Sequence, residues 1–134
     1  MIIFKLNKTL ILLLTILITS CNQTTHKIIT NCYDGDTCYY KENPKAQSIP
    51  IRLMNIDTPE IKGECQEEIT KAIKARDRVN QLIRDSRNIK VDIYYTDKYN
   101  RYVGYIWLDS INLNTILLGE ELAKPYKRNI DWCK

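Results

Sequence analysis

Residues 66–87 read QEEITKAIKARDRVNQLIRDSR, and their apolar side chains recur at the spacing of one helical face. That face is formed by Ile69, Ala72, Ile73, Val79, Leu82 and Ile83. The other face carries Lys71, Lys74, Arg78 and Arg84. Charges on the side opposite an apolar stripe are typical of a solvent-exposed helix surface. The stretch therefore predicts one long helix that covers an apolar core with a single face.

The segments on both sides of this helix have the pattern of β-strands. Before it, two short runs at 28–33 and 37–41 predict a hairpin around an Asp-Gly turn, and a third strand is expected at 49–56. After it, residues 89–95 alternate between apolar and polar side chains, and 102–108 is a further apolar run. These patterns predict three strands before the helix and two after it.

A short second helix is expected at 112–118, with Ser110 available as its N-terminal cap. The resulting order of elements is that of a small Greek-key barrel, the OB-fold. We therefore predict an α+β, mainly β domain: a five-stranded barrel with an inserted long helix and a short second helix. Most of the tyrosines, such as Tyr94 and Tyr105, are expected to belong to the barrel wall.

Length and composition limit the function classes. The chain has 134 residues, enough for one domain, and a net charge of +4 with 44% hydrophobic residues. Its one histidine is His26, which lies in a polar, aperiodic stretch. Ser-His-Asp hydrolases, histidine-metal nucleases and histidine general bases are therefore excluded unless His26 alone serves.

The N-terminus has the features of an export signal. Residues 1–20 contain two lysines, a nine-residue apolar run and small residues before Cys21, as a secretory signal peptide does. The run is too short to span a bilayer, which needs about 20 residues. Ile18-Thr19-Ser20-Cys21 resembles the lipobox of bacterial lipoproteins, so Cys21 is the expected lipidation site. An uncleaved signal anchor and plain secretion are the alternatives.

These features predict an exported protein held on a membrane through Cys21, with a polar tether at 21–27 and one domain at 28–134. The mature chain retains a net charge of +2, because residues 1–20 carry two lysines and no acidic residue. That charge is too small to indicate nucleic-acid binding by itself. We expect a monomer.

Four cysteines remain in the mature domain, an even number that suggests two disulfides in an exported protein. Three pairings are possible. Cys32 and Cys38 flank the Asp-Gly turn, so a hairpin there would bring them together and leave Cys65 to pair with Cys133. A zinc site is the alternative, but the spacings match no common ligand pattern.

Three short segments carry candidate chemistry: Asp34-Gly35-Asp36-Thr37, the stretch 52–60 (RLMNIDTPE) and the stretch 96–101 (TDKYNR). Alone, the first is a turn, the second a strand that ends at a proline, and the third a polar hairpin loop. A calcium loop of the EF-hand type is excluded, because the twelfth position from Asp34 is Lys45 instead of glutamate.

Together these three segments resemble the staphylococcal nuclease (thermonuclease) family, in the family's order and near its spacings. The resemblance extends from about residue 28 to residue 126. It implies an OB-fold, export from the cell and calcium-dependent hydrolysis of DNA and RNA. It further implies an endonuclease or phosphodiesterase that cuts the bond to the 5′ oxygen and leaves 3′-phosphorylated products.

The resemblance also assigns roles to individual residues. Asp36 and Asp57 would bind Ca²⁺ through their carboxylates, and Thr58 through its backbone carbonyl. The catalytic set would be Arg52, Glu60 and Arg101. The substrate-binding set would be Lys98, Tyr99 and Tyr126.

These residue types suit the hydrolysis of an anionic phosphodiester. A hard cation held by oxygen ligands neutralises part of the phosphate charge. Arginines donate two hydrogen bonds each in a planar fork to phosphoryl oxygens. Glu60 is the natural general base for the attacking water, and water is our expected proton donor to the leaving oxygen.

Two segments depart from the family pattern. Only residues 61–65 separate Glu60 from the long helix, so the substrate loop is short, and eight residues follow Tyr126, too few for a C-terminal helix. Two other function classes remain open on the sequence. One is a non-catalytic, surface-anchored OB-fold module that binds nucleic acid, and the other is a structural lipoprotein.

Overall fold

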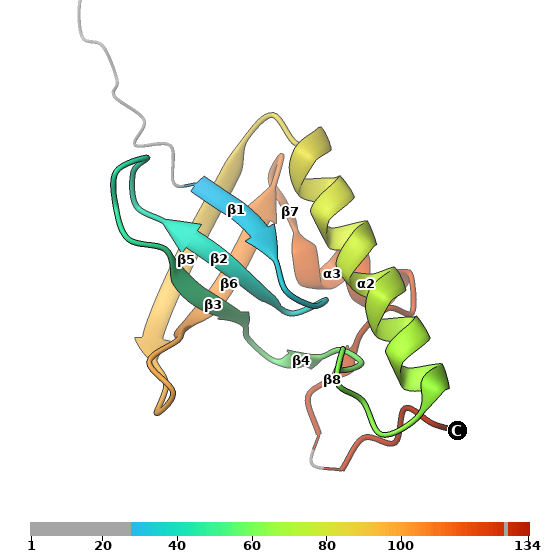
Figure 1. Ribbon diagram of the computed structural model, residues 1–134. Helices are drawn as coiled ribbons and strands as arrows, with labels where there is room; N and C mark the ends of the chain where they lie inside the picture. Colours follow the sequence, from blue (N-terminus) through green and yellow to red (C-terminus); the bar gives the residue numbers. More distant parts are fainter. Residues whose placement is uncertain (1–27, 128) are drawn as a thin grey trace, which may run out of the picture.

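The computed structural model describes residues 28–127 and 129–134, and its centre is a curved sheet in the order β1-β2-β3-β6-β5 (Figure 1). These strands are β1 (Ile28–Cys32), β2 (Thr37–Lys41), β3 (Ile49–Leu53), β5 (Ile89–Thr96) and β6 (Tyr102–Leu108). β3 and β6 run parallel, and the other neighbours in this order run antiparallel. The short β7 (Ile111–Asn112) pairs with β6.

This architecture confirms the predicted α+β, mainly β OB-fold, but the barrel is not closed by hydrogen bonds. β1 and β5 are the two edges of the sheet, and no pairing joins them among the described residues. The long helix α2 (Gln66–Asp85) contacts β1 (Figure 1). The apolar face of α2 therefore shields core residues that a fully paired barrel would cover with strands.

The predicted third strand at 49–56 is interrupted. Asn55 has a φ of 64°, in the left-handed region that few non-glycine residues adopt, so the chain turns after β3. It continues as β4 (Ile56–Asp57), which pairs with β8 (Lys124–Pro125) from the C-terminal part of the chain. This pairing, absent from the sequence prediction, brings the C-terminal segment beside the stretch 52–60.

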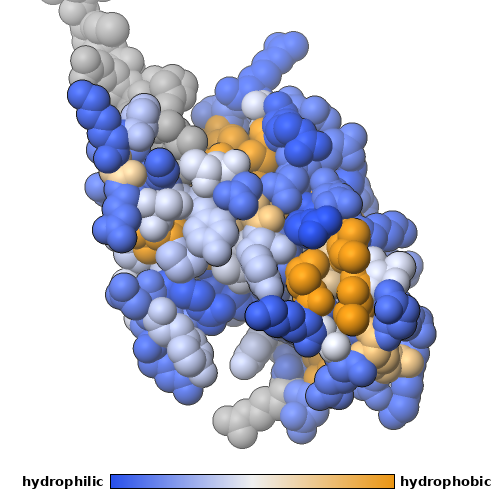
Figure 2. All heavy atoms as spheres, viewed as in Figure 1, coloured by the Kyte–Doolittle hydropathy of each residue, from blue (hydrophilic) through white to orange (hydrophobic). Residues whose placement is uncertain are grey.

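The buried face of α2 differs from the prediction. Its buried apolar residues are Ala72, Ala75, Val79 and Ile83, whereas Ile73 is 40% exposed. The buried set follows steps of three and four residues, and Ile73 falls outside that stripe. Figure 2 shows an otherwise largely hydrophilic face with an apolar patch over α2. The helix ends at Asp85, two residues before its predicted end.

The second helix, α3 (Leu113–Gly119), forms close to its predicted range but with a different cap. The Asn112 side chain accepts a hydrogen bond from the Asn114 N–H at 2.9 Å. Ser110, the predicted cap, has a φ of 71° in the preceding turn. Asn112 takes the capping role because its carboxamide oxygen reaches the free N–H at the helix start.

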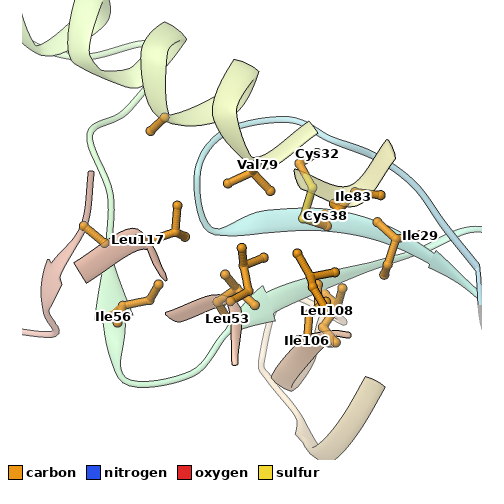
Figure 3. Close-up of a cluster of buried hydrophobic side chains, with 14 of the residues drawn as sticks. Ile29, Cys32, Cys38, Leu53, Ile56, Val79, Ile83, Ile106, Leu108 and Leu117 are labelled. Atoms are coloured by element: carbon orange, nitrogen blue, oxygen red, sulfur yellow. A yellow bond between two sulfur atoms is a disulfide. The ribbon is translucent and has the colours of Figure 1, made fainter. Parts of the chain in front are cut away.

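The core lies between the sheet and the two helices (Figure 3). Leu53 and Ile106 from the sheet pack with Val79 of α2 and Leu117 of α3, and each of the four is at most 1% exposed. The prediction that Tyr94 belongs to the barrel wall is wrong, because Tyr94 is 63% exposed at an irregularity in β5.

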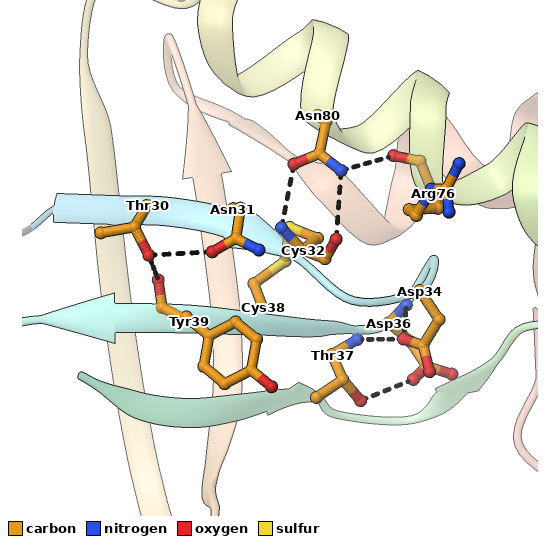
Figure 4. The surroundings of a disulfide bond; sticks show 10 residues. All are labelled: Thr30, Asn31, Cys32, Asp34, Asp36, Thr37, Cys38, Tyr39, Arg76 and Asn80. Carbon is orange, nitrogen blue, oxygen red and sulfur yellow. Dashed lines mark hydrogen bonds between the residues drawn. A yellow bond between two sulfur atoms is a disulfide. The ribbon is translucent and has the colours of Figure 1, made fainter. Parts of the chain in front are cut away.

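Both disulfides have the predicted pairing. Cys32 and Cys38 face each other across β1 and β2, and Cys65 is joined to Cys133 over a separation of 68 residues. Asn80 of α2 binds the first bridge through two hydrogen bonds, accepting from the Cys32 N–H and donating to its carbonyl (Figure 4). The helix is therefore fastened to the hairpin that carries the Asp-Gly turn.

The predicted signal peptide at 1–20, Cys21 and the tether at 21–27 lie outside the described residues. Within the described part of the chain, no helix combines the length and apolar character needed to span a bilayer.

Candidate active site and metal centre

The Asp-Gly turn between β1 and β2 is organised by a buried carboxylate. Asp34, 5% exposed, accepts hydrogen bonds on Oδ1 from the N–H groups of Asp36 at 3.1 Å and Thr37 at 2.7 Å (Figure 4). A Cβ at Gly35 would lie 2.8 Å from the Thr58 side chain and 2.9 Å from Ala75. The turn therefore needs glycine because α2 and the residues after β4 pack directly against it.

Asp36 lies at the centre of the candidate site and is 2% exposed. Its Oδ2 accepts from the Thr58 N–H at 2.9 Å and pairs with the Arg52 guanidinium at 2.6 Å. Its Oδ1 accepts from the Thr37 hydroxyl at 3.1 Å. One carboxylate thus joins two of the three segments that the sequence analysis identified.

Arg52 extends from β3 and binds two of the candidate metal ligands. Its register partner on β2 is Thr37, which places it beside the Asp-Gly turn. Nη1 contacts Asp36, and Nη2 lies 2.9 Å from Asp57 Oδ1, at the end of β4. The guanidinium therefore lies between the two carboxylates, with 16% of its side chain exposed.

The site holds more negative than positive charge. The pKa of Asp36 is raised to about 7, chiefly by burial; Arg52 opposes this shift, and the Asp34 and Asp57 carboxylates add to it. Partial burial and the same two carboxylates also raise the pKa of Glu60. One guanidinium does not compensate this group of acids, so the centre favours an additional cation.

The available donors suit a hard divalent cation. Asp36 and Asp57 supply carboxylates, and neighbouring Thr58 supplies backbone oxygen, the ligand types that calcium takes. The Thr58 hydroxyl is buried beside Asp36 and helps to lower the pKa of that carboxyl. Buried oxygens beside uncompensated carboxylates fit a cation that also binds water.

The third segment forms the tight connection between β5 and β6. The Asp97 N–H donates to the Arg101 carbonyl at 2.9 Å, and Asp97 Oδ1 accepts from the Arg101 N–H at 2.9 Å. Asn100 has a φ of 61°, which this turn requires. The Arg101 guanidinium pairs with Asp97 Oδ2 at 2.8 Å, so its side chain is held in place by the loop.

A surface pocket of about 360 Å³ brings the two predicted catalytic arginines together. Arg52 and Arg101 line it with Asp97, and the exposed Tyr95 and Tyr126 lie on its border. The Tyr126 backbone N–H donates to the Asn55 carbonyl at 3.0 Å, which fixes the C-terminal segment at the pocket. The pocket offers two guanidinium groups and two aromatic rings to one ligand.

Other predicted residues surround this arrangement without lining the pocket. The Tyr99 ring is 67% exposed, and it lies 5.0 Å from Lys98 Nζ and 5.4 Å from Arg101 Cζ. Glu60 lies at the surface beyond Thr58 and Pro59, near enough for Arg52 and Asp57 to influence its pKa. The structure therefore groups Asp36, Arg52, Asp57 and Thr58 closely and places Lys98 and Tyr99 at the edge.

Three residues at or beside the site were absent from the predicted set. Asp34 belongs to the Asp-Gly motif, and the hydrogen bonds that its side chain accepts from the Asp36 and Thr37 N–H groups are typical of aspartate at the start of a turn. Glu68 binds the loop after Glu60, and its signal is the position at the third residue of a helix. Tyr95 reaches the pocket through an irregularity in β5 that no sequence pattern indicates.

Comparison with known proteins agrees with this geometry. Residues 50–133 match the family model described as staphylococcal nuclease homologue. A thermonuclease of Staphylococcus hyicus is 30% identical over 116 residues, covering 80% of this chain and 62% of the relative. Uncharacterized endonucleases of Escherichia coli O157:H7 and Escherichia coli are each 27% identical over 107 residues, covering 77% of this chain. The chain spans 62% of the length of each of these relatives.

Proposed function

Since the chain belongs to the staphylococcal nuclease family, we propose that it is a calcium-dependent nuclease that hydrolyses DNA and RNA with little sequence specificity. The observation that carries this proposal is the Arg52 guanidinium between Asp36 and Asp57, with Arg101 lining the same pocket. Cation-binding carboxylates and phosphate-binding arginines are the two components that phosphodiester hydrolysis needs in one place.

We assign the cation to the carboxylates of Asp36 and Asp57 and the backbone carbonyl of Thr58. When bound, Ca²⁺ supplies positive charge that offsets the charge of the phosphate. The raised pKa of Asp36 supports this assignment, because a buried carboxylate with excess neighbouring acids gains most from a cation. Water and phosphate oxygen can complete a shell that has few protein ligands.

The two arginines would bind the phosphoryl oxygens. Each now pairs with aspartate, Arg52 with Asp36 and Asp57 and Arg101 with Asp97, so both guanidinium groups are held in defined positions. A guanidinium can donate further N–H bonds, and its planar fork matches a phosphate edge. Donors held before the reaction stabilise the developing charge without the cost of reorganisation.

Glu60 is the proposed general base. Its raised pKa makes the carboxylate a stronger base than an ordinary glutamate, because the pKa moves toward neutral pH. Glu60 takes a proton from water, the water oxygen bonds to phosphorus, and the bond to the 5′ oxygen breaks. The leaving oxygen takes its proton from water, and the products carry 3′-phosphates.

The nucleic-acid strand would be held by exposed cationic and aromatic side chains around the pocket. Lys98 and Tyr99 lie at its edge, and Tyr126 lines it. Aromatic stacking tolerates every base, which agrees with the low sequence specificity that we propose. Export through residues 1–20, membrane anchoring through lipidated Cys21 and a monomeric state complete the proposal.

The test is cleavage of single-stranded DNA and RNA by the purified protein in Ca²⁺, and then with excess chelator. We expect cleavage in Ca²⁺, loss of cleavage with chelator, and 3′-phosphate ends on the products. Binding of the same strands by a folded, disulfide-bonded protein without cleavage would contradict the proposal. That result would favour a non-catalytic nucleic-acid-binding module.

A further inference from the structure

Glu68, in the first turn of α2, is a buried carboxylate without an ion pair among the described residues. It is 7% exposed, and its two oxygens accept hydrogen bonds from backbone N–H groups outside the helix. Oε1 accepts from Glu60 at 3.2 Å, and Oε2 accepts from Glu64 at 2.9 Å. One side chain thus binds both ends of the loop that follows the Thr-Pro segment.

The loop also bends closely around this carboxylate. A Cβ at Gly63 would lie 2.6 Å from the Glu68 carboxyl group, closer than side chains can approach. A side chain at position 63 would therefore displace the Glu68 carboxylate from its place under the loop. The short loop at 60–64 contacts the carboxylate at its first, fourth and fifth residues, and Glu68 acts as its internal support.

The position of Glu68 is itself fixed by contacts with the C-terminal segment. Cys65 caps α2, with its sulfur accepting from the Glu68 N–H at 3.3 Å, and the same sulfur is bonded to Cys133. Lys71 Nζ donates to the carbonyl of the buried Trp132 at 3.1 Å. The N-terminal part of α2 is therefore tied to the C-terminal segment by one disulfide and one hydrogen bond.

We propose that Glu68 is a positioning residue for catalysis: its buried carboxylate holds the backbone of the loop 60–64 and thereby sets the place of the Glu60 side chain. This inference rests on the proposed function, because it assigns Glu68 a role that acts through the general base. Glu68 does not touch the substrate. Its two hydrogen bonds hold a short surface loop in one conformation.

The size of the effect follows from the geometry of general-base catalysis. A base displaced by about 1 Å from its productive position can cost about 100-fold in rate. Loss of the bonds from Glu68 releases the Glu60 backbone but leaves the bonds of Asp36, Arg52 and Asp57 in place. We therefore expect the turnover rate to fall while the binding of cation and substrate stays nearly constant.

The test compares Glu68→Gln with Glu67→Gln in the full-length protein. Glu67 is the neighbouring acid; its side chain is 58% exposed and pairs with Lys71. Glu67→Gln is therefore the matched control, because it removes the same charge from the same helical turn. Glutamine keeps the shape of Glu68 but turns one acceptor into a donor that faces an N–H group. We expect a loss of about 10- to 100-fold in kcat for Glu68→Gln, an unchanged KM, and no loss for Glu67→Gln.

A double-mutant cycle distinguishes positioning from a general structural role. If Glu68 acts through Glu60, then Glu68→Gln costs little further activity in a Glu60→Ser protein, whereas independent effects would multiply. Multiplied losses, or a changed calcium affinity with an unchanged kcat, would overturn the inference.

Amide hydrogen exchange tests, without any assay of activity, whether Glu68 holds the loop 60–64. We expect faster exchange of the Glu60 and Glu64 amides in Glu68→Gln, with the core of β3 and α2 unchanged. Unchanged exchange at both amides would show that Glu68 does not hold this loop. An inactive wild-type protein would instead refute the proposed function and the catalytic part of this inference, while the exchange data would still decide whether the loop depends on Glu68.

Discussion

Arg52 and Asp36 form an ion pair of 2.6 Å between Nη1 and Oδ2, and their side chains are only 16% and 3% exposed. Asp36 comes from the turn between β1 and β2, and Arg52 comes from β3. The pair therefore links a candidate metal ligand to a candidate phosphate-binding residue. The first three predictions concern the second arginine, Arg101, and the protonation of Asp36.

Arg101→Ala is expected to lower kcat/KM by about 100- to 1,000-fold, the usual loss for one preorganised donor to a developing oxyanion. The melting temperature should change little, because 31% of the Arg101 side chain is exposed and its pair with Asp97 belongs to a surface loop. Arg76→Ala removes another arginine that pairs with a neighbouring aspartate and is 36% exposed, so it serves as control. Similar activity in both variants would refute the role of Arg101.

Calcium affinity is expected to rise with pH through neutrality. The pKa of Asp36 is raised to about 7 in the metal-free protein, and a protonated Asp36 cannot bind a cation as a carboxylate. Titration calorimetry between pH 5.5 and 8.5 would show tighter binding at the higher pH, with proton release near pH 7. Asp36→Asn should remove this binding, and pH-independent affinity in the unmodified protein would contradict the assignment.

The metal-free protein is expected to lose stability as the pH rises. Because the folded-state pKa of Asp36 is raised from 3.8 to about 7, the folded state binds more protons than the unfolded state between these values. The free energy of unfolding in chelator should therefore decrease across this window, and Asp36→Asn should make the decrease shallower. Urea unfolding at several pH values measures both slopes, and equal slopes would show that Asp36 titrates normally.

Gly35→Ala is expected to destabilise the fold by about 1 to 3 kcal/mol, because the new methyl group would overlap the buried Thr58 and Ala75 side chains. The matched control is Gly119→Ala, where a Cβ would meet no atom within 4 Å. Denaturant unfolding of the two variants measures the difference. A Gly35→Ala protein as stable as the control would mean that the turn can move away from α2.

The two disulfides are expected to differ in their contribution to stability. Chain entropy gives about 4 kcal/mol for the Cys65–Cys133 bridge, which spans 68 residues, and about 2 kcal/mol for the Cys32–Cys38 bridge, which spans 6. Paired alanine substitutions at each bridge, followed by thermal unfolding, test this order. A larger loss from removing the short bridge would contradict the order that chain entropy gives, because Cys32→Ala keeps the backbone groups that bind Asn80.

Much of the fold follows from local patterns in the sequence. The strands at 37–41 and 102–108 form where the apolar runs predict them, and the helix at 66–87 forms except for its last two residues. The cysteine pairing also follows, since a hairpin at the Asp-Gly turn brings Cys32 opposite Cys38. These features depend on near neighbours, whose periodicity and turn preferences are visible in the chain.

Other features of the fold and the site could not be predicted, because they depend on contacts between distant segments. The break after β3 reflects the pairing of β4 with β8, about 70 residues later, and no periodicity indicates it. Ile73 lies outside the buried stripe because the packing of α2 on β1 sets its rotation. Glu68 has the pattern of a polar residue at a helix start, and only the path of the loop 60–64 makes it buried.

Residue type and periodicity thus specify the main strands, both helices and the chemical groups available: carboxylates at Asp36 and Asp57, guanidinium groups at Arg52 and Arg101, and almost no histidine. The position of one guanidinium between both carboxylates, and of the second in the same pocket, comes from the folded chain alone. Local patterns do not reach that far, because they act over a few positions along the chain. Charge balance, burial and hydrogen bonding at the site arise from three segments that meet only when the sheet folds against α2.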